Sequence, residues 1–380
     1  MNKTQFALLE LIKSSLFNTA LNLPDDTDWN AVYKEALDQT VAALAAASVP
    51  RETADMWQEA TLKNTAHYMR VLFEQTNLIN LFKSAGIPLV IIKGCAAAMY
   101  YPVPKLRTMG DIDFLVREKD FESARELLFK NGYVFKEDFG DDRDFIYKKG
   151  EVIFELHKRY SDSRLDIENI LVGGFDNLKE YELNGQKFPA FSADINGLIL
   201  LDHIRHHLYG GLGIRQIIDW MMFLNANLDD TGCIEDLLEL AKSVNLLKLC
   251  KVLTKMCVKY FGLPNKYPWC SDADDETAEE LLNTVLNSGN FGRKDPYVYR
   301  PMSSFTQDVH KKGLFSTLQT AGTQNWQAAK KHKFLRPFAW LYQIFRYIKR
   351  GILALFRGEN LKKDIKEGKK KADFYERLGI

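Results

Sequence analysis

The segment from Asp111 to Val116 constrains the fold of this chain more than any other feature. It first alternates polar and apolar residues and then becomes fully apolar, which predicts a strand that enters a core. Residues two apart on a strand point to the same face, so Asp111 and Asp113 present both carboxylates on one side, about 7 Å apart along the chain. Ile112 and Phe114 face the opposite way. The segment therefore predicts a carboxylate pair at the edge of a core, an arrangement that suits metal chelation.

Other short apolar runs predict further strands of the same sheet. The run from Leu89 to Ile92 has the length of a buried strand, and the residues from Val152 to His157 form another. Glu155 lies within the second run, where burial of a carboxylate is costly without a partner or a metal. We therefore expect Glu155 to be the third metal ligand beside Asp111 and Asp113. Three carboxylates suit Mg²⁺, which prefers hard oxygen ligands.

The residues around the acidic pair predict a phosphate site. Gly94 and Gly110 leave room for a close approach of phosphate to the backbone, and Lys93 and Arg107 carry charges that can pair with phosphate oxygens. The simpler interpretation is that Asp-x-Asp decorates a strand end and that both cations form salt bridges to the acidic pair. The order of these residues along the chain favours the metal and phosphate site.

Helical periodicity precedes and follows the strands, which predicts an α+β chain with a small mixed sheet flanked by helices. We expect a helical segment over 1–85, an α/β domain over 86–190, a helical domain over 191–330, and an amphipathic basic helix with a charged tail over 331–380. A turn at Lys148 to Glu151 predicts a hairpin, and Gly132 predicts the end of a helix that begins at Phe121. The helices expected after the sheet are Ala193–Tyr209, Ile214–Asn225, Ile234–Lys242, Leu246–Phe261 and Thr277–Leu286.

Composition excludes several classes of protein. The 51 basic residues nearly balance the 50 acidic ones, so bulk charge gives no reason to expect binding to long nucleic acid. The five cysteines are scattered and lack a C-x-x-C pair, which argues against a disulfide framework and against a zinc knuckle. Charged residues interrupt the apolar residues of the N-terminus, so no signal core forms. We expect a cytoplasmic protein.

The same residues form a pattern that resembles a known family. The pattern comprises Ile92-Lys93-Gly94, Tyr101-Pro102-x-Pro104, Arg107, Gly110-Asp111-Ile112-Asp113-Phe114-Leu115-Val116 and Glu155-Leu156-His157. It is similar to the poorly characterised bacterial nucleotidyltransferase family of the polymerase-β superfamily. The resemblance implies a polymerase-β-like core that binds Mg²⁺ or Mn²⁺ and a nucleoside triphosphate such as ATP. Asp111, Asp113 and Glu155 would be the catalytic metal ligands, and His157 an accessory residue.

A weaker resemblance continues into the helices that follow. His203 and His207, and then Arg215 and Asp219, resemble the helical segment after the catalytic domain of that family. The resemblance implies that they close over the nucleotide or brace the two domains. His203 and His207 have the spacing of a metal-binding pair, but no glutamate follows His203 as in zinc peptidases, and a packed neutral pair is the more usual outcome.

The expected activity is transfer of a nucleoside monophosphate from a triphosphate to an acceptor, with release of pyrophosphate. The acceptor is open, and small molecules or proteins are favoured over long nucleic acid. One departure leaves an alternative, because the superfamily usually has Gly-Gly or Gly-Ser where this chain has Lys93-Gly94. The alternative is a nucleotide-binding sensor or scaffold protein without turnover.

The stretch from Phe334 to Phe356 interleaves aromatic residues with arginines and lysines. It could lie on a membrane surface as an amphipathic helix, which would make the chain a peripheral membrane partner. Alternatively, it could pack on the core with snorkelling arginines, and this packing is the favoured interpretation. We expect the lysine-rich residues 362–371 to form a solvated helix or tail.

Overall fold

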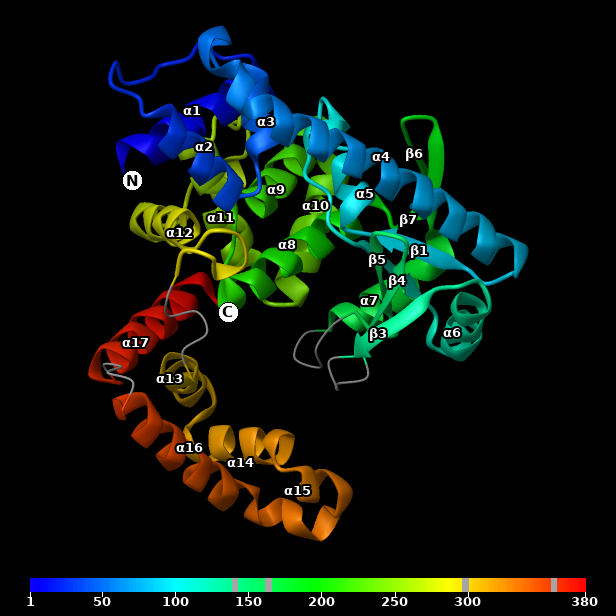
Figure 1. Ribbon diagram of the computed structural model, residues 1–380, viewed down its shortest axis with the longest axis vertical. Helices are drawn as coiled ribbons and strands as arrows, with labels where there is room; N and C mark the ends of the chain where they lie inside the picture. The colour runs from blue at the N-terminus through cyan, green and yellow to red at the C-terminus, as the bar shows by residue number, and fades with distance from the viewer. Residues whose placement is uncertain (139–142, 161–165, 296–300, 357–360) are drawn as a thin grey trace.

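A five-stranded mixed sheet occupies the middle of the chain in the computed structural model, which describes residues 1–138, 143–160, 166–295, 301–356 and 361–380 (Figure 1). Its strands are β1 (Leu89–Ile92), β2 (Ile112–Val116), β3 (Val134–Asp138), β4 (Asp144–Lys149) and β5 (Val152–His157). They lie in the order β1-β2-β5-β4-β3. The β2–β5 pair is parallel and the other pairs are antiparallel. The predicted mixed sheet and the hairpin between β4 and β5 are therefore confirmed.

One long helix joins the sheet to the rest of the molecule. Helix α4 (Ala54–Ser84) spans 31 residues and lies along the sheet in Figure 1. Trp57 near its start is buried in a core formed with the other helices, whereas Tyr68 and Phe82 are buried in the core of the sheet. The sheet core also receives α6 (Phe121–Lys130), which ends before Gly132 as predicted. Because α4 contributes to both cores, it ties the sheet to the helical part.

The helices after the sheet follow the expected periodicity. They are α8 (Ala193–Gly210), α9 (Ile214–Ala226), α10 (Thr231–Ser243), α11 (Leu247–Tyr260) and α12 (Asp275–Ser288). Each begins and ends within three residues of its predicted bounds. The N-terminal helices α1 (Lys3–Phe17), α2 (Trp29–Asp38) and α3 (Ala42–Ala45) share one hydrophobic core with them. Residues from the two predicted helical segments therefore pack together in space.

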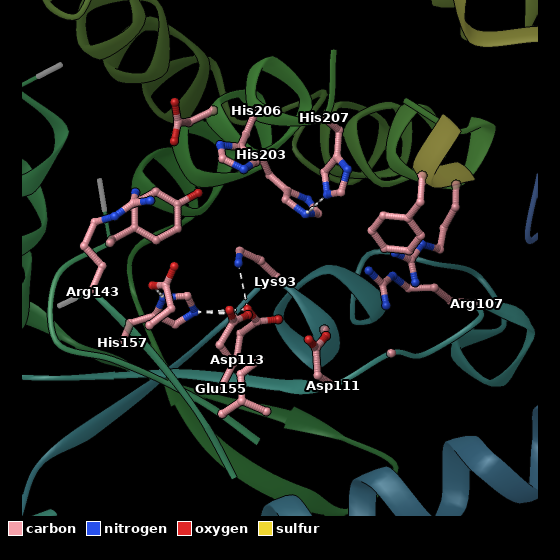
Figure 2. A pocket seen from close by; sticks show the side chains of 18 residues that line it. Lys93, Arg107, Asp111, Asp113, Arg143, Glu155, His157, His203, His206 and His207 are labelled. Atoms are coloured by element: carbon pink, nitrogen blue, oxygen red, sulfur yellow. Dashed lines mark hydrogen bonds and ion pairs between the residues drawn. The ribbon is translucent and has the colours of Figure 1, made fainter. Parts of the chain in front are cut away.

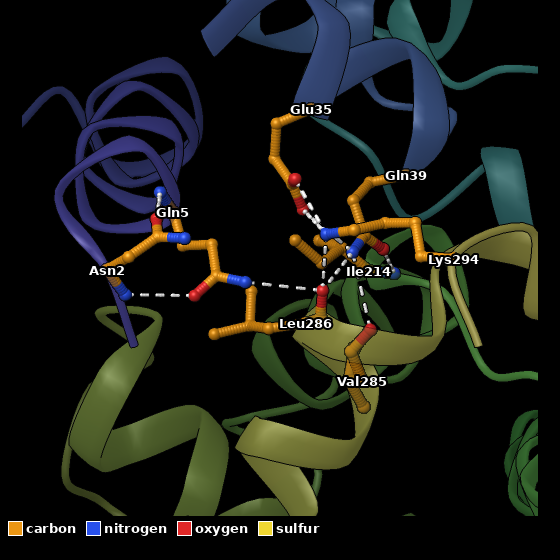
Figure 3. Close-up of polar contacts among 8 residues, drawn as sticks. All are labelled: Asn2, Gln5, Glu35, Gln39, Ile214, Val285, Leu286 and Lys294. Atoms are coloured by element: carbon orange, nitrogen blue, oxygen red, sulfur yellow. Dashed lines mark hydrogen bonds and ion pairs between the residues drawn. The ribbon is translucent and has the colours of Figure 1, made fainter. Parts of the chain in front are cut away.

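A side chain from the end of α2 and one from the segment after α12 cap the end of α12 (Figure 3). The last carbonyls of a helix have no partner within the helix. Gln39 donates to the carbonyls of Val285 and Leu286 at 3.3 Å each, and Lys294 donates to that of Leu286 at 2.7 Å. Lys294 also pairs with Glu35. These bonds fix α2 against the helical core.

The C-terminal helices form an arm that extends from the body and then returns to it (Figure 1). Its helices are α13 (Pro301–Lys312), α14 (Leu314–Asn325), α15 (Gln327–Lys331), α16 (Ala339–Phe356) and α17 (Leu361–Leu378). Helix α16 packs on α14 and lies apart from the main core. Helix α17 packs along α13, and its end inserts Phe374, Tyr375 and Leu378 into the helical core. The lysines of residues 362–371 lie on this helix and most are exposed, as expected for a solvated helix, whereas the apolar residues that follow them pack on the core.

Several elements were not predicted from the sequence. They are β3, the hairpin of β6 (Lys179–Leu183) and β7 (Gln186–Ala190), and helix α7 (Ile167–Gly174). Their strands are short and rich in exposed charged residues, so they carry a weak apolar pattern. The division of the chain into four segments stays a prediction. Among the described residues, the packing forms two main cores, and the C-terminal arm extends from them.

Candidate metal and nucleotide site

Four polar side chains gather on one face of the sheet because of strand register. Asp113 on β2 lies directly opposite Glu155 on the parallel strand β5. His157 is two residues further along β5 and therefore points to the same face. Asp144 on β4 is the register partner of His157. The backbone pairing thus brings these side chains together over the centre of the sheet.

The resulting cluster has the dimensions of a metal site (Figure 2). One ligand atom each from Asp113, Glu155 and His157 lies within 4.8 Å of the others. His157 Nε2 is 3.1 Å from Asp113 Oδ1 and 3.6 Å from Glu155 Oε2, and its Nδ1 is 2.6 Å from Asp144 Oδ1. Two carboxylates and an imidazole held this closely can bind a divalent metal, and Asp144 orients the ring as an outer partner.

Burial and the neighbouring charges shift the pKa values of the two carboxyl groups in opposite directions. Burial raises the pKa of Glu155 to about 8, and the neighbouring Asp113 charge adds to this effect. Burial also raises the pKa of Asp113, but Lys93 and His157 outweigh it and hold that pKa well below its usual range. Because burial is the main cause of the raised pKa of Glu155, a cation bound beside this residue would favour its ionised form. The residues therefore fit a metal.

Lys93 lies beside the cluster in a strained backbone conformation. It has φ 53° and ψ −130° at the point where β1 gives way to α5 (Gly94–Ala98). Such conformations are costly for a non-glycine residue and concentrate at functional sites. Lys93 Nζ donates to Asp113 Oδ1 at 2.7 Å. The salt bridge that was the simpler interpretation is therefore present, and contact of Lys93 with phosphate stays a prediction.

Asp111 stands at the mouth of the site, directly before β2. Repulsion from Asp113 and burial raise the pKa of Asp111. Its carboxylate lies near the cluster in Figure 2 but is not among the three tightly grouped ligands. Gly94 packs close to the Asp111 carbonyl, since a Cβ added at Gly94 would lie 3.6 Å from it. The predicted ligand Asp111 thus lies at the site, and its contact with a metal stays a prediction.

Arg107 pairs with Asp219, whereas the sequence predicted phosphate or the acidic pair as its partner. Its Nε and Nη2 donate to the two carboxylate oxygens of Asp219 at 2.7 and 2.8 Å, and Tyr101 donates to the same carboxylate at 2.7 Å. The guanidinium and the carboxylate are both buried. The sequence could not show this pairing because Asp219 lies 112 residues away on α9. Asp219 therefore braces the helical part against the sheet part, one of the two roles expected for it.

Arg215 lines the cavity and has a donor without a partner among the described residues. It lies at the start of α9, and its Nη1 is 3.8 Å from the position that a Cβ on Gly110 would occupy. Nη1 donates to the carbonyl of Thr108 at 3.2 Å, whereas the buried Nε has no hydrogen-bond partner among the described residues. A buried unpaired guanidinium donor is costly. Because Arg215 lines the cavity, its guanidinium could pair with an anion there.

A cavity of about 430 Å³ lies between the sheet face and helix α8. His203, His206 and His207 line it from α8, across from Lys93 and Asp113 (Figure 2). His203 and His207 contact each other through their Nε2 atoms at 2.9 Å. Burial lowers the pKa of His203 and lowers that of His207 to about 3. A packed neutral pair was the favoured interpretation, and the geometry agrees with it.

A second cavity of about 840 Å³ adjoins the first. His206, His207 and Phe291 line both cavities. The far wall comes from α13 and α17, through Gln307 and Glu376 among others. The candidate site thus has a floor formed by the carboxylate cluster and a separate side chamber.

Several lining residues were not predicted from the sequence, namely Arg143, Asp144, Ile146, Tyr160, Asp202, His206 and Phe291. Asp144 could have been found, because it begins the strand that the β4–β5 hairpin pairs with His157. Tyr160, whose ring lies 5.7 Å from Lys93 Nζ, follows β5 after a turn. The others come from elements that only the tertiary fold brings to the cavity.

The comparison with protein families identifies the class. The family described as "Uncharacterised nucleotidyltransferase" matches residues 25–262, which is more than half of the chain. The chain therefore belongs to this nucleotidyltransferase family, as the sequence motifs predicted. The matched region contains the sheet, the carboxylate cluster and helices α8 and α9.

Comparisons with individual known proteins do not define the function further. No curated protein matches the chain. An antigenic nucleotidyltransferase-like protein from Paracoccidioides brasiliensis is similar in structure at 17% identity, over 46% of this chain and 93% of that chain. The TM-score is 0.27, so this likeness carries no argument about the function of this chain.

The proton on Glu155 predicts a pH-dependent response to Mg²⁺. The native pKa of about 8 exceeds the ordinary value of 4.5, so protonation of Glu155 stabilises the folded protein at low pH. That contribution is lost as the pH rises through about 8. Mg²⁺ must compete with this proton. We expect Mg²⁺ to raise the melting temperature more at about pH 9 than at about pH 6.

Differential scanning fluorimetry with and without Mg²⁺ measures this effect. Glu155→Gln should lose the pH dependence of the shift, whereas the exposed control Glu182→Gln should keep it. Equal Mg²⁺ shifts at both pH values in the unchanged protein would contradict the assignment of Glu155 as a metal ligand.

Proposed function

We propose that the chain is a metal-dependent nucleotidyltransferase that moves a nucleoside monophosphate from a nucleoside triphosphate to an acceptor. The observation that carries the proposal is the buried cluster of Asp113, Glu155 and His157, within a chain of the nucleotidyltransferase family. Asp113 and Glu155, with Asp111 at the mouth, would hold Mg²⁺ or Mn²⁺. When bound, the metal supplies charge neutralisation for the triphosphate and lowers the pKa of an attacking hydroxyl.

The transfer forms one bond and breaks another. An acceptor oxygen attacks the α-phosphorus, and the bond from that phosphorus to its bridging oxygen breaks, so pyrophosphate leaves with the electron pair. The acceptor proton must be removed as the new bond forms. In its ionised form Glu155 would accept this proton, because a carboxylate whose pKa is raised to about 8 is a stronger base than an ordinary carboxylate. His157 keeps the carboxylates in place through its bond to Asp144.

Arg215 and Lys93 are the cations assigned to the triphosphate. Arg215 lines the cavity, and an arginine can bind phosphate oxygens bidentately. Lys93 can exchange its contact with Asp113 for one with phosphate once a metal neutralises that carboxylate. Arg107 has its three donor nitrogens on Asp219 and Met109, so its contact with phosphate is the weaker proposal.

The side chamber is the place for the acceptor. It opens beside the metal cluster and shares His206 and His207 with the catalytic cavity. Its volume of about 840 Å³ suits a small molecule or a protein side chain better than a duplex.

A screen with the four α-labelled nucleoside triphosphates tests the proposal. The full chain is incubated with Mg²⁺ or Mn²⁺ and a cell extract, and pyrophosphate release and label transfer are measured. We expect both with at least one triphosphate. Gln307→Trp, which fills the chamber, should suppress label transfer while metal-dependent triphosphate binding remains. Binding without any pyrophosphate release, whatever the acceptor, would favour a nucleotide sensor or scaffold instead.

A further inference from the structure

The arm carries an unusual concentration of positive charge. Residues 309–358 contain ten lysines and arginines and no aspartate or glutamate, although the whole chain is nearly neutral. Five of these cations, Lys331, Lys333, Arg336, Lys349 and Arg350, are exposed. A local excess of this kind attracts an anionic surface even when the net charge is small.

The same arm exposes an apolar stripe on α16. Leu341, Phe345, Ile348 and Ile352 are all exposed, and their spacing places them on one face of the helix. Phe345 is 69% exposed and Ile348 is 54% exposed. Phe334 and Phe338, which precede the helix, are exposed as well and alternate with Lys333 and Arg336. We call Leu341, Phe345, Ile348 and Ile352 the apolar stripe.

The opposite face of α16 is built into the arm. Gln343 is buried and accepts a hydrogen bond from Asn325 of α14 at 3.4 Å. Tyr342 stacks on Trp326 with ring centroids 5.3 Å apart. The stripe is therefore the outward face of an ordered helix pair. Figure 1 shows this pair far from the sheet.

We propose that the apolar stripe and the surrounding cations bind the arm to an anionic lipid bilayer surface. Apolar and aromatic side chains enter the interface while lysines and arginines pair with acidic headgroups. No helix among the described residues is long and apolar enough to span a bilayer, so α16 lies in the plane of the surface. A second copy of this chain is a poorer occupant, because its arm would bring the same positive charge. The proposal is independent of the proposed enzyme activity.

Vesicle flotation of the full chain tests this proposal. The probes are phosphatidylcholine vesicles with about 30% phosphatidylglycerol, and phosphatidylcholine vesicles alone. We expect binding to the anionic vesicles only, and its loss in about 0.5 M salt, which screens the headgroup charge. Absence of binding at low salt, or equal binding to both vesicles, would overturn the proposal.

Matched variants assign the contact to the arm. Phe345→Glu with Ile348→Glu should weaken binding at least about tenfold, because each apolar side chain contributes to insertion. Phe129→Glu with Val172→Glu changes equally exposed apolar residues elsewhere and should leave binding unchanged. Melting temperatures of both double variants report whether they fold.

Charge variants separate electrostatic attraction from apolar insertion. Lys331→Glu with Lys333→Glu should also reduce binding at least about tenfold, since each lysine near the surface contributes to attraction. Lys119→Glu with Lys136→Glu changes exposed lysines outside the arm and should not. Equal losses in the control variants would overturn the proposal. A dimer in sedimentation velocity that Phe345→Glu dissociates would assign the stripe to a second copy and overturn it as well.

Discussion

Replacing Asp113 by asparagine is expected to reduce metal-dependent pyrophosphate release by about 1000-fold or more. Asp113 lies at the centre of the cluster, opposite Glu155 in the sheet and 3.1 Å from His157. Asparagine keeps the shape of the side chain but removes the charge that a divalent metal needs. Radiolabelled pyrophosphate release, at saturating triphosphate and metal, measures the effect.

Two further variants show whether the loss comes from the site. Asp229→Asn removes an exposed carboxylate from a turn before α10 and should leave the activity unchanged. Glu155→Gln should also abolish the activity, and it keeps the Lys93–Asp113 salt bridge, so its folding is less affected. Full activity in both Asp113→Asn and Glu155→Gln would show that the cluster does not perform the reaction.

Replacing Asp219 by alanine is expected to lower the free energy of unfolding by about 3–5 kcal/mol. Arg107 is 4% exposed and has both of its strong bonds to this carboxylate. Without Asp219 its charge would be buried and unpaired, and Tyr101 would lose its acceptor as well. Urea denaturation followed by circular dichroism measures the change. Lys187→Ala, which removes an exposed pair with Glu180, should change the stability little.

The two arginines of the site should therefore behave differently. Arg215→Ala removes a guanidinium whose Nε is unpaired, so it should weaken triphosphate binding without a large loss of stability. Arg107→Ala should cause the large loss of stability. The reverse pattern, with Arg107→Ala stable but weak in triphosphate binding, would return the phosphate role to Arg107.

The core of the site could be predicted from the sequence because it rests on local strand periodicity. Asp113 and Glu155 lie on short apolar runs, and the i, i+2 rule fixes the face that each carboxylate occupies. His157 follows from the same rule applied to Glu155. The helices of the second half were predictable for a similar reason, since their apolar residues recur at helical spacing.

The partners of the arginines could not be predicted, because they depend on tertiary packing. Arg107 and Arg215 look alike in the sequence, and only the position of α9 decides that Asp219 neutralises the first. The burial of α17 and the exposure of α16 could not be predicted for the same reason. The sequence could not show that α17 buries Tyr375, whose hydroxyl donates to the carbonyl of Leu208, while α16 keeps its apolar stripe exposed.

The most direct test of a metal-dependent nucleotide site is calorimetry of triphosphate binding with and without Mg²⁺. The unchanged protein should bind a nucleoside triphosphate with a clear dependence on Mg²⁺. The double variant Asp111→Asn with Asp113→Asn should lose that dependence, since it removes two of the three carboxylates assigned to the metal. Mg²⁺-dependent binding that is the same in the double variant and in the unchanged protein would contradict the assignment.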